Sequence, residues 1–175
     1  IYDTNTGIDT TFLPSSRMGR PGKGYISFIS QSGAFAAAIL DWAEMTGIGV
    51  SRVVSFGNKC DVDEVDLLRY LGGDPETRVI VEYMEGLSPG AGARYLKVAE
   101  EVTRLKPVIV VKSGRTARGS VAAASHTGAL AGDARLYDFA FKQAGLLVAK
   151  DFEDAFDMAK TLVAQPPAQG NRILV

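Results

Sequence analysis

The sequence predicts an α/β domain, with a doubly wound parallel sheet of about five strands and helices on both faces, of the flavodoxin-like kind. Three observations predict this fold. Short apolar runs rich in β-branched residues alternate with longer stretches of helical character. The connections between them are short, which favours right-handed crossovers between parallel strands. One helical stretch has a continuous apolar stripe, as expected of a helix that covers a sheet.

Five apolar runs are expected to form the strands, because valine and isoleucine suit the pleated surface of a sheet. Their short lengths and apolar composition fit parallel strands that are buried on both faces. The runs are residues 25–29, 50–56, 79–84, 108–111 and 146–148.

Five further stretches are expected to be helical. In the third of them, apolar residues recur at steps of three and four residues, and charged residues occupy the other side. The apolar stripe consists of Tyr95, Val98, Ala99, Val102 and Leu105. The five stretches are residues 34–45, 62–71, 91–105, 134–144 and 152–164.

The composition excludes several classes of protein. The chain has 19 Lys and Arg residues and 20 Asp and Glu residues, which gives a net charge of −1. Its overall charge therefore does not favour binding to a nucleic acid or to an anionic membrane. Cys60 is the single cysteine, which excludes an internal disulfide and suits a reducing compartment. We find no run of roughly 18 apolar residues and no signal-peptide pattern. We therefore expect a cytoplasmic protein that binds neither nucleic acid nor membrane.

The chain of 175 residues fits one domain of ordinary size. Residues 1–23 have no sustained apolar period, so we expect a lead-in that lies across a surface. The domain proper is expected at 24–165, and a linker with the start of a further strand at 166–175. The first residue is not methionine and the last three are apolar, which indicates a piece of a longer polypeptide. Its chemistry is then expected to need parts that are absent here.

The loop after the first strand is a candidate anion site, because ligands of doubly wound sheets gather at the carboxyl ends of the strands. Ser32, Gly33 and Ala34 begin the following Ala-rich helix. A helix start offers unpaired N–H groups and the positive end of the helix dipole, and glycine lets an anion approach the backbone. A serine N-cap worth about 1 kcal/mol is an equally good interpretation.

Acidic residues follow the second and third strands. Glu85 falls at the carboxyl end of the third, where a carboxylate can accept the Nδ1 proton of an imidazole and leave Nε2 as the nucleophile. A solvated loop acid is the alternative. Asp61, Asp63, Glu64 and Asp66 suit a helix N-terminus by charge alone, so no metal site is predicted.

His126 is the only histidine, and small residues surround it. A neutral imidazole is abundant near pH 7, so an unhindered one can act as a nucleophile or a proton shuttle. Ser125, Thr127 and Gly128 are its candidate phosphate-binding neighbours. The histidine lies in a loop of roughly twenty residues, and loops of that length in compact domains tend to be functional. A surface histidine without a task is the alternative.

Four motifs resemble those of the NDP-forming acyl-CoA synthetases, which include ADP-forming acetyl-CoA synthetase and are related to the α subunit of succinyl-CoA synthetase. The motifs are ISQSGA at 29–34, SFGNKCDVDE at 55–64, SGRT at 113–116 and SHTGALAG at 125–132. They occur in the family's order and cover nearly the whole chain.

The resemblance implies that His126 is transiently phosphorylated and that Glu85 contacts the phosphohistidine. It also implies that Ser32, Gly33 and Ala34 hold the phosphoryl group. The family's reaction, that of an acid–thiol ligase, interconverts acyl-CoA, phosphate and NDP with free acid, CoA and NTP. CoA, Mg-ADP or Mg-ATP, and phosphate are thus expected as substrates, with no tightly bound cofactor on this domain.

The same resemblance implies CoA-binding, ligase and ATP-grasp domains in the same chain or in a partner subunit, and an oligomeric enzyme. The fragment alone is not expected to complete turnover. A regulatory or CoA-sensing module of a protein acetyltransferase is the alternative, and a flavin-binding domain is a poorer one. The sequence leaves open the acyl group, the choice between ADP and GDP, and the division into subunits.

Overall fold

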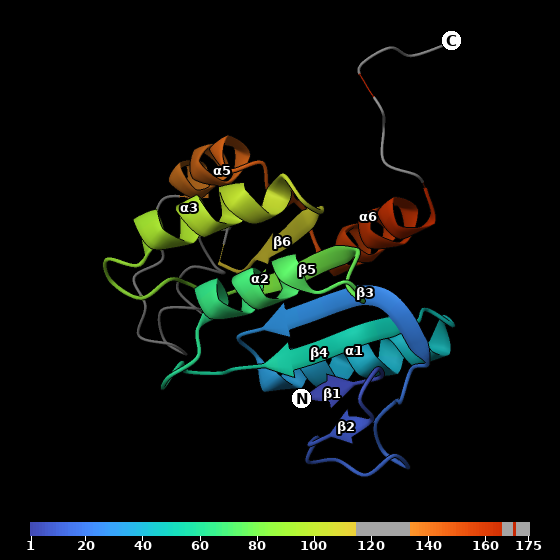
Figure 1. Ribbon diagram of the computed structural model, residues 1–175. Coiled ribbons are helices and arrows are strands. Elements are labelled where there is room, and N and C mark those ends of the chain that lie inside the picture. The colour runs from blue at the N-terminus through green and yellow to red at the C-terminus, as the bar shows by residue number, and fades with distance from the viewer. Residues whose placement is uncertain (115–133, 166–169, 171–175) are drawn as a thin grey trace.

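The computed structural model describes residues 1–114, 134–165 and 170 (Figure 1). The strands are β1 (Tyr2–Asp3), β2 (Ile8–Asp9), β3 (Lys23–Ser30), β4 (Val50–Ser55), β5 (Val79–Met84), β6 (Val108–Lys112) and β7 (Leu147–Val148). The helices of the described residues are α1 (Gly33–Met45), α2 (Glu64–Gly73), α3 (Gly92–Thr103), α5 (Ala134–Gln143) and α6 (Phe152–Ala164).

The strands form one sheet with the order β2-β1-β4-β3-β5-β6-β7. β4, β3, β5, β6 and β7 are parallel, so the predicted parallel sheet of five strands is confirmed. The sheet is nevertheless mixed, because β1 and β2 extend its edge in antiparallel orientation. Both strands belong to the segment that was expected to lie across a surface. Each has only two residues, too few to show an apolar period.

The sheet separates two apolar clusters. One lies between the sheet and helices α1 and α6, and includes Phe28, Val81 and Phe156. The other lies between the sheet and helices α2, α3 and α5, and includes Ile29 and Ile80. Consecutive strand residues thus point to opposite faces, and both faces are covered by helices, as Figure 1 shows. The doubly wound α/β fold is confirmed.

The order of the strands reverses between β3 and β5. These neighbouring parallel strands are followed by helices on opposite faces, since α1 packs in the first cluster and α3 in the second. A crevice at the carboxyl ends of two such strands is where ligands of doubly wound sheets bind. The loops after β3 and β5 are therefore the first place to look for a site.

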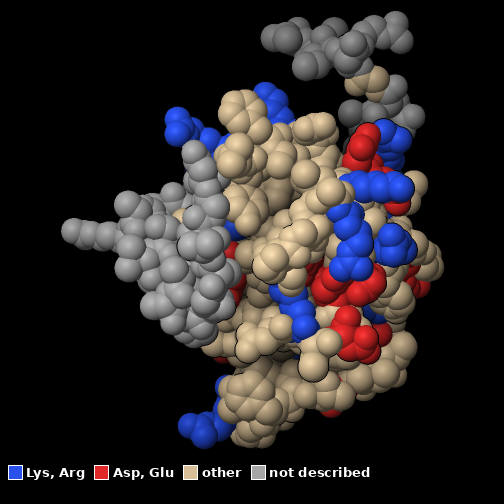
Figure 2. All heavy atoms as spheres, turned by 90° about the vertical axis from the view of Figure 1, so that its left-hand side faces the viewer, with Lys and Arg blue, Asp and Glu red and all other residues tan. Residues whose placement is uncertain are grey.

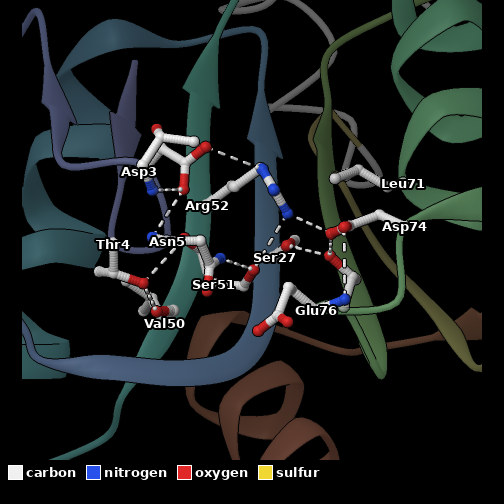
Figure 3. Close-up of polar contacts among 12 residues, drawn as sticks. Asp3, Thr4, Asn5, Ser27, Val50, Ser51, Arg52, Leu71, Asp74 and Glu76 are labelled. Atoms are coloured by element: carbon white, nitrogen blue, oxygen red, sulfur yellow. Dashed lines mark hydrogen bonds and ion pairs between the residues drawn. The ribbon is translucent and has the colours of Figure 1, made fainter.

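A buried ion network joins the N-terminal strands to the rest of the sheet (Figure 3). Arg52 of β4 donates from Nε to Asp3 Oδ2 at 3.0 Å and from Nη1 to Asp74, which follows α2. Asp74 also accepts from Thr77 Oγ1 at 2.5 Å, and Thr77 contacts Ser27 of β3 at 2.7 Å. The positive charge of Arg52 thus lies between two buried carboxylates, so β1 is fixed to the sheet by more than its short ladder.

Among the described residues, no helix is both long and apolar enough to cross a membrane. Figure 2 views the molecule from the left-hand side of Figure 1, toward which the arrows of β3 and β4 point. Acidic and basic side chains are interspersed on the part of that face that is described, and neither sign dominates it.

Candidate functional site at the carboxyl ends of β3 and β5

The start of α1 is shaped by two serines. The Ser30 hydroxyl donates to the Ser32 carbonyl at 2.8 Å and accepts from the Ser32 N–H at 3.1 Å, which fixes the turn after β3. Ser32 is the N-cap of α1, and its Oγ accepts from the Phe35 N–H at 3.2 Å. The expected serine cap is therefore present.

The cap leaves the first turn of α1 open to an anion. Gly33 and Ala34 are exposed, and their N–H groups have no acceptor within the helix, because the carbonyls four residues before them precede the helix. No residue of this turn is acidic. The positive end of the helix dipole is thus not offset by a neighbouring carboxylate of the same turn. Capping and anion binding, the two interpretations of the sequence, are compatible in this geometry.

Gln31 joins this turn to the segment that carries Glu85. Its Oε1 accepts from the N–H groups of Glu85 at 2.5 Å and of Gly86 at 2.9 Å, and its Nε2 donates to the Gly86 carbonyl at 2.8 Å. Gln31 is only 8% exposed. The side chain between β3 and α1 therefore determines where the backbone after β5 lies.

Two lysines donate hydrogen bonds to carbonyl groups of the same backbone. Lys59 Nζ donates to the Gly86 carbonyl at 2.8 Å, and Lys112 Nζ, at the end of β6, donates to the Glu85 carbonyl at 2.8 Å. We call Gln31, Lys59 and Lys112 together the loop clamp. Its members follow or end three different parallel strands, and so they converge at one edge of the sheet.

A buried acidic pair lies behind the loop clamp. Glu64, at the start of α2, is fully buried and pairs with Lys59 Nζ at 3.0 Å. Glu82 of β5 is also fully buried and accepts from the Tyr95 hydroxyl at 2.7 Å. Burial raises the pKa of Glu82 to about 8, against the opposing effect of the Tyr95 hydrogen bond. The raised pKa favours the protonated form of Glu82, which limits the negative charge buried near Glu64.

Tyr83 connects Glu85 to α1. Its ring stacks on Phe35 of the first turn of α1, with the ring centroids 4.0 Å apart. Burial is the larger cause that raises the pKa of the Tyr83 phenol, and the negative charge of Glu85 raises it further. The stacking of Tyr83 on Phe35 thus links the strand that leads to Glu85 with the first turn of α1.

The structure thus brings together four of the predicted site residues, Ser32, Gly33, Ala34 and Glu85, at the switch point of the sheet. The other four lie outside the described residues: Ser125, His126, Thr127 and Gly128.

The three residues of the loop clamp were not predicted as site residues. Gln31 stands inside the serine and glycine motif, and Lys59 and Lys112 follow or end strands, so position was the only available signal. Position alone does not reveal which backbone atoms a side chain will contact.

Three of the four acidic residues before and in α2 have structural partners: Asp63, Glu64 and Asp66. Asp63 caps α2 and forms a capping box with Asp66, and it also pairs with Arg94. In the parts of the chain that the structure describes, no group of three or more His, Cys, Asp or Glu side chains is arranged to hold a metal ion.

The fold and this edge of the sheet define a class of protein, a doubly wound α/β domain with an exposed helix start beside an acidic residue on a fixed loop. Such a helix start is a common site for phosphate. The sequence matches the model of the succinyl-CoA ligase-like flavodoxin domain over residues 23–162. The chain belongs to this family.

Relatives in the comparisons are ligases. The chain is 44% identical over 175 residues to the alpha subunit of ADP-forming acetate–CoA ligase I from Pyrococcus furiosus, covering 100% of this chain and 37% of that one. It is 45% identical over 173 residues to ADP-forming acetate–CoA ligase from Methanocaldococcus jannaschii, covering 99% of this chain and 24% of that one.

A solved structure agrees with these relatives. It is dinucleotide-forming acetyl-coenzyme A synthetase 1 from Candidatus Korarchaeum cryptofilum, in complex with phosphate and ADP. The TM-score is 0.81 at 49% identity, and the match covers 85% of this chain and 32% of that one. The chain thus spans roughly a quarter to a third of the proteins it resembles.

Proposed function

We propose that this chain is the phosphohistidine-carrying domain of an ADP-forming acyl-CoA synthetase, with His126 as the carrier. The observation that carries the proposal is that the open start of α1 lies beside the clamped Glu85 loop, in a domain of the succinyl-CoA ligase-like flavodoxin family. The relatives named above are ADP-forming acetate–CoA ligases. ADP, phosphate, CoA and a short acid are therefore the proposed substrates of the whole enzyme.

The proposed reaction has three steps. An oxygen of phosphate attacks the thioester carbonyl, the C–S bond breaks, and CoA leaves as the thiol with one proton. Nε2 of His126 then attacks the phosphorus of the acyl phosphate, so that a P–N bond forms, a P–O bond breaks and the free carboxylate leaves. In the last step an oxygen of ADP takes the phosphoryl group, which gives ATP and restores the imidazole. Each step is reversible, since the phosphoramidate keeps the free energy of the thioester.

The start of α1 is proposed to hold the phosphoryl group while it is transferred. Phosphoryl transfer needs positioning and charge stabilisation more than covalent chemistry from the protein. The N–H groups of Gly33 and Ala34 and the helix dipole supply both, because they are fixed before the substrate arrives. The braced turn formed by Ser30 and Ser32 supports this role.

Glu85 is proposed to accept the Nδ1 proton of His126. This contact fixes the tautomer whose Nε2 is free to attack, and it stabilises the positive charge that develops on the ring. An orienting carboxylate must itself be held in place, and the loop clamp holds both peptide groups that flank Glu85. The clamp is what supports a catalytic role over that of a solvated loop acid.

The whole enzyme is proposed to contain CoA-binding and nucleotide-binding parts beyond this chain. The relatives are longer than the chain, which leaves room for such parts in the same polypeptide or in a partner subunit. An oligomeric assembly follows if the parts are divided between subunits.

The test uses the full-length protein and radiolabelled Mg-ATP. The wild type is expected to acquire an acid-labile, alkali-stable phosphate, and His126→Ala is expected to acquire none. Glu85→Gln is expected to be labelled at least tenfold more slowly, because it removes the charge that stabilises the imidazolium. Label that persists in His126→Ala, or no label in the wild type, would contradict the proposal.

A further inference from the structure

Lys112 ends β6 and has contacts that reach beyond the loop clamp. Its Nζ donates to the Glu85 carbonyl at 2.8 Å and to the Ser113 carbonyl at 2.7 Å. The same ammonium group lies over the ring of Tyr137 in α5, 4.8 Å from the ring centroid, which is within the range of a cation–π contact. Lys112 is only 8% exposed, and hydrogen bonds of a charged group are stronger in such a buried setting.

These three partners of the ammonium group come from different parts of the chain. Glu85 follows β5, Ser113 follows β6, and Tyr137 lies near the start of α5. Residues 115–133, which include His126, lie between Ser113 and Tyr137 in the sequence and outside the described residues. One side chain therefore contacts the Glu85 loop and both described flanks of the segment that contains His126.

The partners of Lys112 are themselves held in place. The N–H of Ser113 donates to the Met84 carbonyl at 2.9 Å, so Ser113 continues the ladder between β5 and β6. The Tyr137 ring contacts the ring of Phe141, with the centroids 5.5 Å apart, and Phe141 is only 1% exposed. The contacts of Lys112 thus join parts of the fold that are anchored in the sheet and in the core.

We infer that Lys112 is a positioning residue for phosphoryl transfer, which holds the Glu85 loop in place relative to both flanks of the segment that carries His126. The inference rests on the proposed function, in which Glu85 accepts the Nδ1 proton of His126. A carboxylate orients an imidazole only if the two groups are held at hydrogen-bond distance. Gln31 fixes the Glu85 backbone relative to β3 and α1, whereas Lys112 fixes it relative to β6 and α5.

The ammonium group suits this role because it contacts carbonyl oxygens and a ring face at the same time. Carbonyl oxygens accept hydrogen bonds and the face of an aromatic ring is negative, so one cation binds both. Lys112→Met keeps the apolar stem and loses all three contacts. Lys112→Arg keeps a cation that can donate to carbonyls and stack on a ring. The role therefore predicts opposite results for these two substitutions.

Lys106 provides a matched control at the other end of the same strand. Its Nζ donates to three backbone carbonyls at 2.7 to 2.9 Å. Lys106 precedes β6 and Lys112 ends it, so the two ammonium groups lie at opposite ends of the strand. Lys106→Met thus removes the same kind of hydrogen bond at a distance from Glu85, and it reports the effect of lost stability alone.

The experiment follows labelling of the full-length enzyme by radiolabelled Mg-ATP, corrected for the folded fraction, over a range of Mg-ATP concentrations. Lys112→Met is expected to lower the maximal labelling rate about tenfold or more, because a small displacement of an orienting group has a large effect on rate. The Mg-ATP concentration that gives half of this rate is expected to stay within about twofold of the wild-type value, since nucleotide binding is not altered. Lys112→Arg is expected to keep at least about a third of the wild-type rate, and Lys106→Met to stay within about twofold of it.

A second variant keeps the test decisive if Lys112→Met does not fold. Tyr137→Leu removes the ring and leaves the hydrogen bonds of Lys112 in place. It is expected to lower the maximal labelling rate about two- to fivefold, as for the loss of one cation–π contact. Phe139→Leu is its control, because Phe139 is an aromatic residue of the same helix that is 75% exposed, and its labelling is expected to equal that of the wild type.

The inference is overturned if Lys112→Met and Tyr137→Leu are labelled at the wild-type rate, or if Lys106→Met or Lys112→Arg is slowed as much as Lys112→Met. Amide exchange of the Gly86 N–H gives a readout that needs no labelling, because its peptide group contains the Glu85 carbonyl. The exchange rate is expected to rise in Lys112→Met and not in Lys106→Met. Normal labelling of Lys112→Met refutes the positioning role alone, whereas a wild type that acquires no label refutes the proposed function and with it the role of Lys112 in transfer.

Discussion

Replacing Gln31 by alanine is expected to release the backbone that carries Glu85. The substitution removes three hydrogen bonds, two from the N–H groups of Glu85 and Gly86 and one to the Gly86 carbonyl. At about 1 kcal/mol for each hydrogen bond, the loss is about 3 kcal/mol. Lys59 still donates to the Gly86 carbonyl in the variant. Most of the lost free energy therefore comes from the two N–H groups that lose their acceptor. The structure thus predicts a local defect that also lowers global stability.

Amide hydrogen exchange of the Glu85 and Gly86 N–H groups measures the local part of this loss. If about 3 kcal/mol of protection is removed, the exchange rates of these two amides rise about a hundredfold. Urea unfolding measures the global part, as a lower midpoint with an unchanged slope. Labelling of His126 by Mg-ATP is expected to slow at least tenfold in the same variant, because a small displacement of an orienting group has a large effect on rate.

Gln143→Ala is the matched control, because Gln143 is an exposed glutamine at the end of α5. Its unfolding free energy is expected to stay within about 0.5 kcal/mol of the wild-type value. If the Glu85 and Gly86 amides of Gln31→Ala exchange as slowly as in the wild type, the side chain of Gln31 does not hold the loop. The account of how Glu85 is positioned would then be wrong.

Three further predictions concern stability and the helix start. The pKa of Glu82 is raised from 4.5 to about 8 by burial, so between these pH values the folded state keeps a proton that the unfolded chain has lost, and the unfolding free energy falls as the pH rises. Glu82→Gln should remove this contribution, so that the unfolding free energy from urea unfolding depends less on pH between pH 5 and 8. An unchanged pH dependence would show that Glu82 is not the group responsible. Arg52→Met leaves the buried carboxylates of Asp3 and Asp74 without their cation. It is expected to lower the unfolding free energy by about 3 to 5 kcal/mol. A loss below about 1 kcal/mol would mean that water replaces the arginine. Ser32→Ala removes the cap of α1 and is expected to lower the stability measured by thermal unfolding by about 1 kcal/mol. It should also slow the labelling of His126 by more than this loss of stability explains. Normal labelling together with the expected loss of stability would show that Ser32 is only a structural cap.

The five parallel strands and the helices between them could be predicted because their signals are local. A strand buried on both faces is a mostly apolar run, and Val79–Met84 has the predicted bounds. β1 and β2 could not be predicted in this way, because two residues show no period and the pairing partner of Tyr2 and Asp3 is about fifty residues away, in β4. The fold of the segment before β3 depends on these distant partners, and the Arg52 network is one of them.

Part of the candidate site could be predicted, because a single residue type at a strand end was enough to propose its role. Ser32 and Glu85 were chosen in this way. A serine before a helix indicates an N-cap or an anion site, and a carboxylate after a strand can orient an imidazole. The loop clamp needs three side chains from separate parts of the chain, so no local pattern indicates that Gln31 contacts Gly86. The same holds for the burial of Glu82, since its neighbours in sequence are those of any strand.

The role of His126 stays a prediction, because the residue lies outside the described part of the chain. The most direct test isolates the labelled full-length enzyme, free of nucleotide, and divides it between two reactions. We predict that ADP removes the label as ATP, and that acid together with CoA removes it as inorganic phosphate with an equal amount of acyl-CoA. Label that leaves with only one of the two partners would contradict the central claim that one histidine carries the phosphoryl group between both half-reactions.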